Sequence, residues 1–175
     1  MGGVSLGQAG AIAGHPDHAA RMDGRTGYVR AAHTAALATG NTFTLEAWVK
    51  RATVGVSQGL FAKGNGSYQV FFDATDRLVL RQAGNADIVR STVALTDRTA
   101  FHHLAVTKSG PAVRLYVDGV DRTGAVADRT IGDTTGALVI GAGAGYLNGT
   151  LDEVAVYAGA LTAATIARHH AAGAG

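Results

Sequence analysis

The sequence predicts an all-β fold: a two-sheet antiparallel jelly-roll β-sandwich that ends in one short helix. Three observations support it. Apolar and polar residues alternate over short segments, which is the period of a half-buried strand. These segments recur roughly every 8 to 12 residues, a spacing typical of sandwiches and barrels rather than of βαβ units. The 25 glycines against 2 prolines indicate many tight turns.

The clearest element is a β-hairpin over residues 101–120. Leu104 and Val106 lie on one face of its first strand. A turn at residues 108–111 leads to a second strand, whose inward residues are Val113, Leu115 and Val117. The pair Asp118-Gly119 then suits a tight turn. We expect these aliphatic residues to be core and the other face to be a mixed polar and aromatic surface.

The remaining elements are predicted in chain order. Residues 1–20 are an arm or a first edge strand, and residues 28–30 form a short strand. The strong strand at residues 43–50 places Leu45 in the core and Trp48 on the opposite face. Further strands are expected over residues 60–63, 67–73, 77–82, 88–93, 137–141 and 147–157, with Val154 in the core. A helix over residues 162–170 begins at Thr162, a plausible N-cap.

Composition limits the function classes. A chain of 175 residues that is 47% hydrophobic is long enough for one domain, residues 1–175, and too short for two ordinary ones. The net charge is +2 and the basic residues are scattered, so we expect no nucleic-acid partner. No cysteine is present, and no apolar run reaches the roughly 20 residues of a membrane span. The N-terminus has no signal-peptide pattern.

The sequence lacks two patterns that would indicate a nucleotide-binding loop or a glycosidase active site. The glycine run at residues 141–145 has neither the third glycine nor the following helix of a nucleotide-binding loop, so a hairpin loop is expected. Glycoside hydrolases need two carboxylates that flank one bond. Glu46 and Glu153 are the only glutamates, and Asp152 is expected to point away from Glu153.

Two residues remain as candidates for binding. Asp152 lies in an otherwise apolar strand, so its carboxylate needs either hydrogen bonds or a hard cation such as calcium. Trp48, the only tryptophan, is either a stacking platform for a sugar or a packing residue. The seven histidines are expected to be structural or solvated.

The hairpin, with its sequence FHHLAVTKSGPAVRLYVDGV, resembles the central hairpin of the laminin-G-like group within the concanavalin-A-like lectin and glucanase superfamily. The segments FTLEAWVK at residues 43–50 and GTLDEVAVY at residues 149–157 resemble an early core strand and the closing strand of that group. Met22-Asp23-Gly24 resembles its opening strand. The resemblance runs from about Met22 to the C-terminus, with Phe101 where the family most often has tryptophan.

The resemblance implies a structural calcium ion held by Asp23, Asn41 and Asp152. It also implies a non-catalytic binding module, carbohydrate-binding or adhesive, that is part of a longer bacterial extracellular or cell-surface protein. Its expected partner is a glycan or another cell-surface ligand, without membrane insertion. The alternative is a structural or spacer module of a multidomain or tail-like assembly, and a minor alternative is a glycoside hydrolase.

Overall fold

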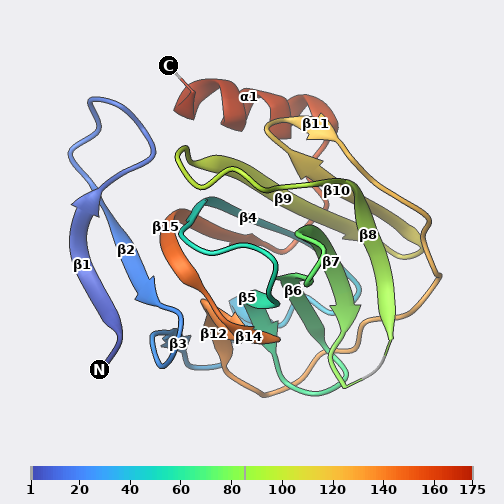
Figure 1. The fold of residues 1–175 in the computed structure, drawn as a ribbon. Helices are drawn as coiled ribbons and strands as arrows, with labels where there is room; N and C mark the ends of the chain where they lie inside the picture. The colour runs from blue at the N-terminus through green and yellow to red at the C-terminus, as the bar shows by residue number, and fades with distance from the viewer. Residues whose placement is uncertain (1, 85, 175) are drawn as a thin grey trace.

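The computed structural model describes residues 2–84 and 86–174 and confirms the predicted sandwich. Two antiparallel sheets pack face to face, and helix α1 (Ala163–Gly173) lies on the outer face of one of them (Figure 1). Within these described residues, no helix has the length and apolar character needed to cross a membrane.

The strands are arranged as follows. The seven-stranded sheet has the order β1 (Val4–Ala9), β2 (His18–Asp23), β15 (Asn148–Tyr157), β4 (Thr42–Arg51), β9 (His102–Ser109), β10 (Ala112–Val117) and β11 (Val120–Asp121). The six-stranded sheet has the order β3 (Val29–Ala31), β12 (Leu138–Ile140), β5 (Gln58–Lys63), β6 (Tyr68–Phe72), β7 (Arg77–Gln82) and β8 (Asp87–Ala94). The 3-10 turn η1 (Ala35–Leu37) and the small hairpin of β13 (Ala142–Gly143) with β14 (Gly145–Tyr146) complete the fold.

The core lies between the two sheets. Strand β4 pairs with β9 in an unbroken register from Thr42 opposite Ser109 to Val49 opposite His102. Because side chains alternate along a strand, every second residue of β4 faces the core. Those residues are Phe43, Leu45, Ala47 and Val49, and all are buried. The predicted core residues of the 101–120 hairpin are buried with them: Leu104, Val106, Val113, Leu115 and Val117.

The outer face of the hairpin differs from the prediction. Tyr116 points away from the core, as expected, yet it is buried because helix α1 covers it. Ile166 of the helix packs on Ala105 and Tyr116. The helix begins after Thr162, whose hydroxyl accepts a hydrogen bond from the backbone N–H of Thr165 (3.2 Å), and it extends three residues beyond the predicted end.

The prediction that Val154 of β15 lies in the core is wrong, because this residue is 36% exposed. The register between β15 and β4 shifts between Asp152 and Ala155, which marks a β-bulge with one extra residue. Glu153 adopts φ 47° there, a conformation that a residue with a side chain rarely takes. Simple alternation, used to place Val154 in the core and to orient Asp152 against Glu153, fails at this bulge.

Leu115→Ala should lower the free energy of unfolding by about 2 to 5 kcal/mol, because Leu115 is fully buried between the sheets. Val154→Ala removes methyl groups from the same kind of strand at an exposed site and should change stability by about 0.5 kcal/mol or less. Urea denaturation of both variants checks the prediction. Equal losses would contradict the core assignment.

Candidate functional site

The structure covers Trp48 with the C-terminal helix. Trp48 is only 6% exposed. Its ring stacks on the ring of His170, with centroids 5.7 Å apart, and lies beside the ring of His103, with centroids 5.2 Å apart. A β-carbon added to Gly173 would lie 2.4 Å from the indole, so only glycine allows the helix to approach so closely. In this structure Trp48 is therefore a packing residue, whose indole is largely covered by the helix.

The three predicted calcium ligands do not come together. The Oδ1 atom of Asp23 accepts hydrogen bonds from three backbone N–H groups, those of residues 25 to 27 (2.8 to 2.9 Å). These bonds hold the pKa of Asp23 well below its usual range. The Oδ1 atom of Asn41 accepts from the N–H of Ile131 (3.0 Å), and the Oδ2 atom of Asp152 accepts from the N–H of Ala11 (2.7 Å).

The register of β4 shows how far apart Asn41 and Asp152 lie. Asn41 precedes β4, whereas Asp152 pairs with Trp48, seven residues further along that strand, a distance of about 23 Å. One ion cannot contact both Asn41 and Asp152, so these residues do not fit a single calcium site. Calcium binding by the chain itself stays a prediction, which melting with and without calcium would check.

A different set of candidate ligands lies beside Asp152. The ligand atoms of His15, Asp17 and Glu153 all lie within 4.8 Å of one another. A hydrogen bond joins the Asp17 and Glu153 side chains, which lowers the pKa of Asp17 and raises that of Glu153. Sequence reasoning missed this group of three residues because the bulge turns Glu153 toward the loop between β1 and β2. The two carboxyl groups are closer than the about 5 Å that a retaining glycosidase uses, so a sugar does not fit between them.

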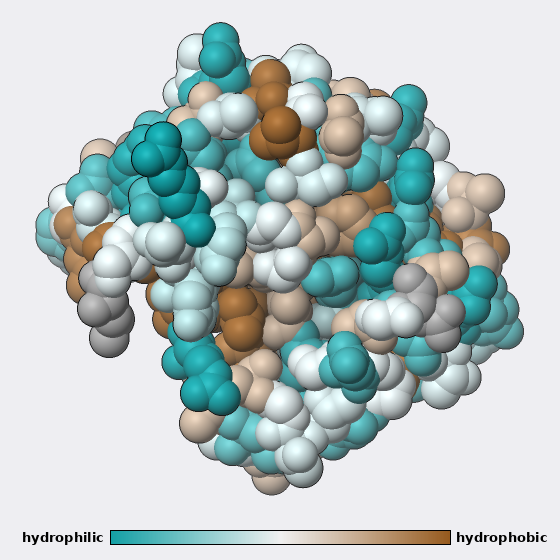
Figure 2. All heavy atoms as spheres, turned by 60° about the horizontal axis from the view of Figure 1, so that its bottom comes forward, coloured by the Kyte–Doolittle hydropathy of each residue, from teal (hydrophilic) through white to brown (hydrophobic). Residues whose placement is uncertain are grey.

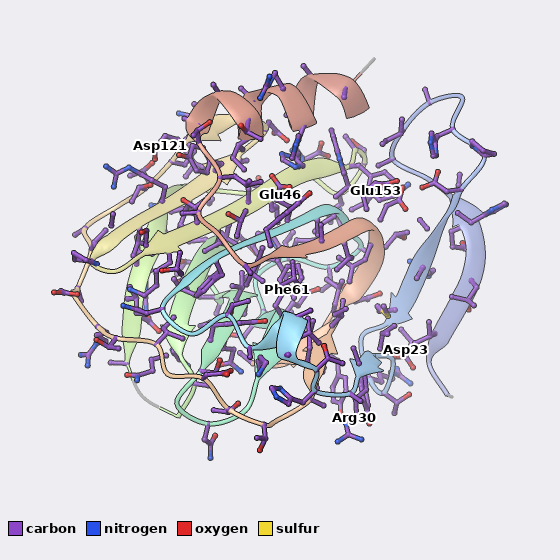
Figure 3. All side chains as sticks on the ribbon, turned by 180° about the vertical axis from the view of Figure 1, so that it is seen from behind. Asp23, Arg30, Glu46, Phe61, Asp121 and Glu153 are labelled. Atoms are coloured by element: carbon purple, nitrogen blue, oxygen red, sulfur yellow. The ribbon has the colours of Figure 1, made fainter. Side chains whose placement is uncertain are left out.

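Glu46 is buried beneath helix α1 (Figure 3) and lines a pocket there. Its Oε2 atom lies 2.9 Å from Nδ1 of His169 on the helix, and its Oε1 atom lies 3.8 Å from Nε2 of His103 on β9. Tyr157 and Trp48 also line this pocket of about 240 Å³. These contacts fasten the helix to the seven-stranded sheet. Burial, followed by the charges of His170 and His169, lowers the pKa of His103 to about 4.

Acidification should destabilise the protein through His103. In the unfolded chain this histidine titrates near 6.5, whereas its pKa in the folded chain is about 4. Between these values the unfolded chain binds a proton that the folded chain does not, so stability falls as pH falls through this window. The loss attributable to His103 is at most about 3 kcal/mol. Urea denaturation at pH 7 and at pH 4.5 measures it.

The His103→Gln variant is the control for this loss, because glutamine is similar in size and does not titrate. His102, whose pKa Asp118 raises, changes stability in the opposite direction, but both proteins share that effect. The variant should therefore lose less stability than the wild type on acidification. An equal loss in the two proteins would rule out a buried neutral His103.

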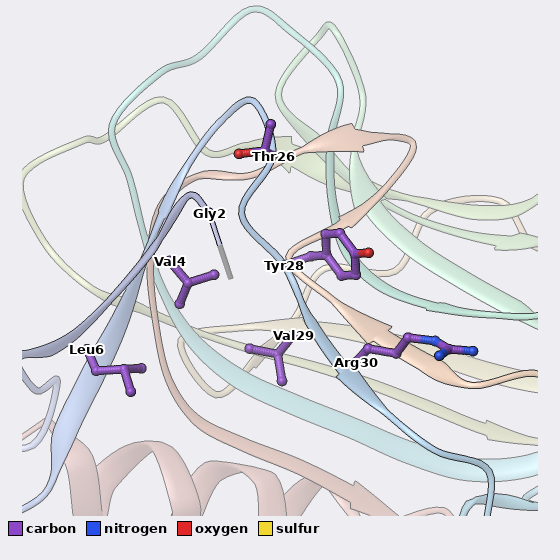
Figure 4. A pocket seen from close by; sticks show the side chains of 7 residues that line it. All are labelled: Gly2, Val4, Leu6, Thr26, Tyr28, Val29 and Arg30. Carbon is purple, nitrogen blue, oxygen red and sulfur yellow. The ribbon is translucent and has the colours of Figure 1, made fainter.

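A groove lies where the edges of the two sheets meet. Strand β1 is the edge of the seven-stranded sheet, and β3 is the edge of the six-stranded sheet. The groove, of about 870 Å³, is lined by Gly2, Val4, Leu6, Thr26, Tyr28, Val29 and Arg30 (Figure 4). We call it the edge groove. It is mostly apolar, and Arg30 is its one charged residue in the described part of the chain.

The N-terminal arm and the turn after β2 are in close contact beside the edge groove. The N–H of Asp23 donates to the carbonyl of Gly3 (3.0 Å), and a β-carbon on Gly27 would lie 2.0 Å from that same carbonyl. Only glycine at position 27 permits this approach. Because Asp23 also caps residues 25 to 27, the chain leaves the turn in a fixed direction and places Tyr28 at the end of the groove.

A second hollow adjoins the groove and contains two tyrosines. The glycine run at residues 141–145 forms the β13–β14 hairpin, in which Gly141, Gly143 and Gly145 all have positive φ. This hairpin brings Tyr146 next to Tyr28, with ring centroids 6.5 Å apart. The hollow, of about 260 Å³, is lined by Tyr28, Arg30, Val139, Ala142 and Tyr146. We call it the two-tyrosine pocket.

The two tyrosines are open to solvent, since Tyr28 is 43% exposed and Tyr146 is 42% exposed. In Figure 4, Tyr28 and Arg30 point to one side of their segment, whereas Val4, Leu6 and Val29 gather on the other. Figure 2 shows that the strongly hydrophobic residues on its face occur in small separate groups. Exposed rings beside a guanidinium can stack on a flat, partly apolar ring and donate hydrogen bonds to its polar edge.

Sequence reasoning missed this site. Tyr28 directly precedes the three-residue strand β3, Tyr146 ends a glycine-rich hairpin, and no local pattern shows that the two residues meet. The available signal was an exposed aromatic next to a tight turn, which is common on surfaces. Trp48 is the stacking candidate that the sequence offers because it is the only tryptophan, with packing as the alternative role.

Comparison with solved structures supports the fold assignment. Domain 4 of AbnA, a GH43 extracellular arabinanase from Geobacillus stearothermophilus solved in complex with arabinotriose, is 18% identical and has a TM-score of 0.72. The match covers 94% of this chain and 86% of that one.

Two larger proteins contain a similar domain. The binding domain of Paraclostridial Mosquitocidal Protein 1 is 15% identical with a TM-score of 0.71, and the match covers 97% of this chain and 45% of that one. Trypanosoma rangeli sialidase is 15% identical with a TM-score of 0.67, and the match covers 96% of this chain and 32% of that one. At these identities the likeness shows the fold alone.

No curated protein sequence matches the chain. A family model, described as the concanavalin A-like lectin/glucanases superfamily, matches residues 23–167, which is most of the sequence. The matched segment extends from the end of β2 into helix α1, so it includes the six-stranded sheet, the seven-stranded sheet apart from β1 and most of β2, and all of the two-tyrosine pocket. The chain therefore belongs to the concanavalin A-like lectin/glucanases superfamily.

Proposed function

We propose that this chain is a non-catalytic carbohydrate-binding module that binds a glycan in the two-tyrosine pocket. The observation that carries the proposal is the exposed pair Tyr28 and Tyr146 beside Arg30. Sugar rings present an apolar C–H face and polar hydroxyl edges. Tyrosine rings pack against such a face, while phenol and guanidinium groups bond the hydroxyls.

The lining of the pocket favours binding over cleavage. Hydrolysis of a glycosidic bond uses a pair of carboxylates at the bond. No aspartate or glutamate is among the described residues that line the two-tyrosine pocket or the edge groove. The pair of carboxylates is thus missing from the described walls, whereas groups for stacking and hydrogen bonding are present.

The known structures are consistent with this reading. The arabinanase domain with a similar fold was solved with arabinotriose bound, and the sialidase match covers only 32% of that enzyme. We extend the proposal to the setting: a module of a longer bacterial protein that acts outside the cell or at its surface and uses the glycan for attachment. A spacer role without a ligand is the alternative.

Tyr28→Ala and Tyr146→Ala should each weaken glycan binding at least about tenfold, because each removes a stacking face of the pocket. A glycan array identifies the strongest oligosaccharide, and isothermal titration then measures its affinity for each protein. Tyr157→Ala is the matched control, since Tyr157 lies on the outer face of the other sheet. Melting temperatures of all variants confirm that they fold.

Two outcomes would overturn the proposal. If the array shows no oligosaccharide binding, the spacer role is the better description. If binding persists in both pocket variants, the glycan binds elsewhere. The fluorescence of Trp48, the only tryptophan, then tests the earlier platform prediction, because a sugar at that ring should change its emission, whereas one in the two-tyrosine pocket should not.

A further inference from the structure

The walls of the two hollows carry a single charged side chain. Tyr28 and Arg30 are the two residues that line both the edge groove and the two-tyrosine pocket. Every other described residue lining them is apolar, glycine, threonine or tyrosine. Tyr28 and Arg30 therefore lie where the hollows adjoin, so an oligosaccharide that spanned both would pass over these two residues.

Arg30 differs from the other arginines of its sheet in having no described partner. Arg81 lies 2.6 Å from Asp87 and stacks over Phe71, and Arg90 lies 2.7 Å from Asp87. Arg77 donates to the carbonyl of Ser91 (2.7 Å). Among the described residues, the side chain of Arg30 takes part in no hydrogen bond or ion pair. Its five donors are consequently available to a ligand.

The backbone of Arg30 is fixed although its side chain is free. Arg30 pairs with Val139 in the ladder between β3 and β12, and Val139 lines the two-tyrosine pocket. The guanidinium therefore starts from a rigid position beside the tyrosines. Asp23 is the acid tied to the rim of the groove, through Thr26, but its carboxylate already accepts hydrogen bonds from residues 25 to 27. It is committed to its own turn and does not neutralise Arg30.

We infer that the ligand of this site is an acidic glycan, and that Arg30 binds the carboxylate of a uronic or similar sugar acid. This inference rests on the proposed function. The planar guanidinium fork matches a carboxylate with two parallel N–H···O bonds, which a neutral hydroxyl cannot reproduce. No carboxylate is among the described residues that line the hollows, so Arg30 is the charged side chain that a bound anion would meet on these walls. The tyrosines would stack on the sugar ring while Arg30 selects its charge.

The test compares ligands that differ only in charge. The probes are an oligosaccharide of galacturonic acid, its methyl-esterified and therefore uncharged form, a neutral galactose oligomer and a sulfated galactose oligomer. The wild type should bind the galacturonic acid form about 10- to 100-fold more tightly than the methyl ester. Higher salt should weaken only the binding of the charged forms.

Variants of Arg30 test whether this residue causes the preference for the acidic ligand. Arg30→Gln should remove the preference for the acid over the ester and leave the affinity for the ester unchanged. Arg30→Lys keeps the charge but lacks the fork, so it should retain part of the preference. Arg25→Gln is the matched control, because it removes an exposed arginine that lines neither hollow. That variant should bind all probes as the wild type does.

The outcomes distinguish the inference of an acidic ligand from the proposed glycan site. If the sulfated oligomer alone is preferred, the site recognises sulfate and the assignment to a carboxylate is wrong. Equal binding of acid and ester, with loss of both in Tyr28→Ala, overturns the acidic ligand but upholds the proposed glycan site. If Arg30→Gln and Arg25→Gln weaken the acid equally, net charge rather than Arg30 accounts for the preference, which also overturns the inference. Absence of binding to every probe and every arrayed oligosaccharide refutes the proposed function, and the inference with it.

Discussion

Strand β4 is buried on both faces, and each face packs against a different layer. Leu45 and Ala47 pack against the six-stranded sheet, whereas Glu46 and Trp48 lie beneath helix α1. The alternation of side chains in one strand thus joins three layers. Because Gly173 lets the helix end directly on the Trp48 ring, the helix covers this part of the seven-stranded sheet. The polar contact between Glu46 and His169 fastens the helix in that position.

The six-stranded sheet is occupied in a different way. Its outer face carries Arg81 over Phe71 and the pairs of Arg81 and Arg90 with Asp87, so its charges satisfy one another. At the edge between the two sheets, fewer side chains are engaged in such contacts. There β1 and β3 each lack a neighbour on one side, and side chains such as Tyr28 remain largely exposed. A binding surface at this edge therefore interferes with neither the core nor the helix.

The sequence predicted the sandwich because its core strands follow a simple alternation, as Leu104 and Val106 do opposite Leu115 and Val117. It failed at Val154, since a bulge adds one residue without leaving a compositional mark. It placed Trp48 on the outer face correctly, but alternation does not reveal that a helix covers this face. Asp23, Asn41 and Asp152 were joined through the family resemblance, and hydrogen bonds within the chain engage each of them separately.

The two-tyrosine pocket was beyond sequence reasoning because it depends on a contact between segments far apart in the chain, yet its parts are held rigidly. A β-carbon on Gly145 would lie 2.3 Å from the carbonyl of Ser57, and one on Gly59 would lie 2.4 Å from the carbonyl carbon of Ala142. The hairpin that carries Tyr146 is therefore pressed onto β5, while the β12 ladder holds Arg30. A ligand that binds there orders few groups and loses little conformational entropy. For a shallow site with few contacts, this rigidity is what makes selective binding of a flexible oligosaccharide physically reasonable.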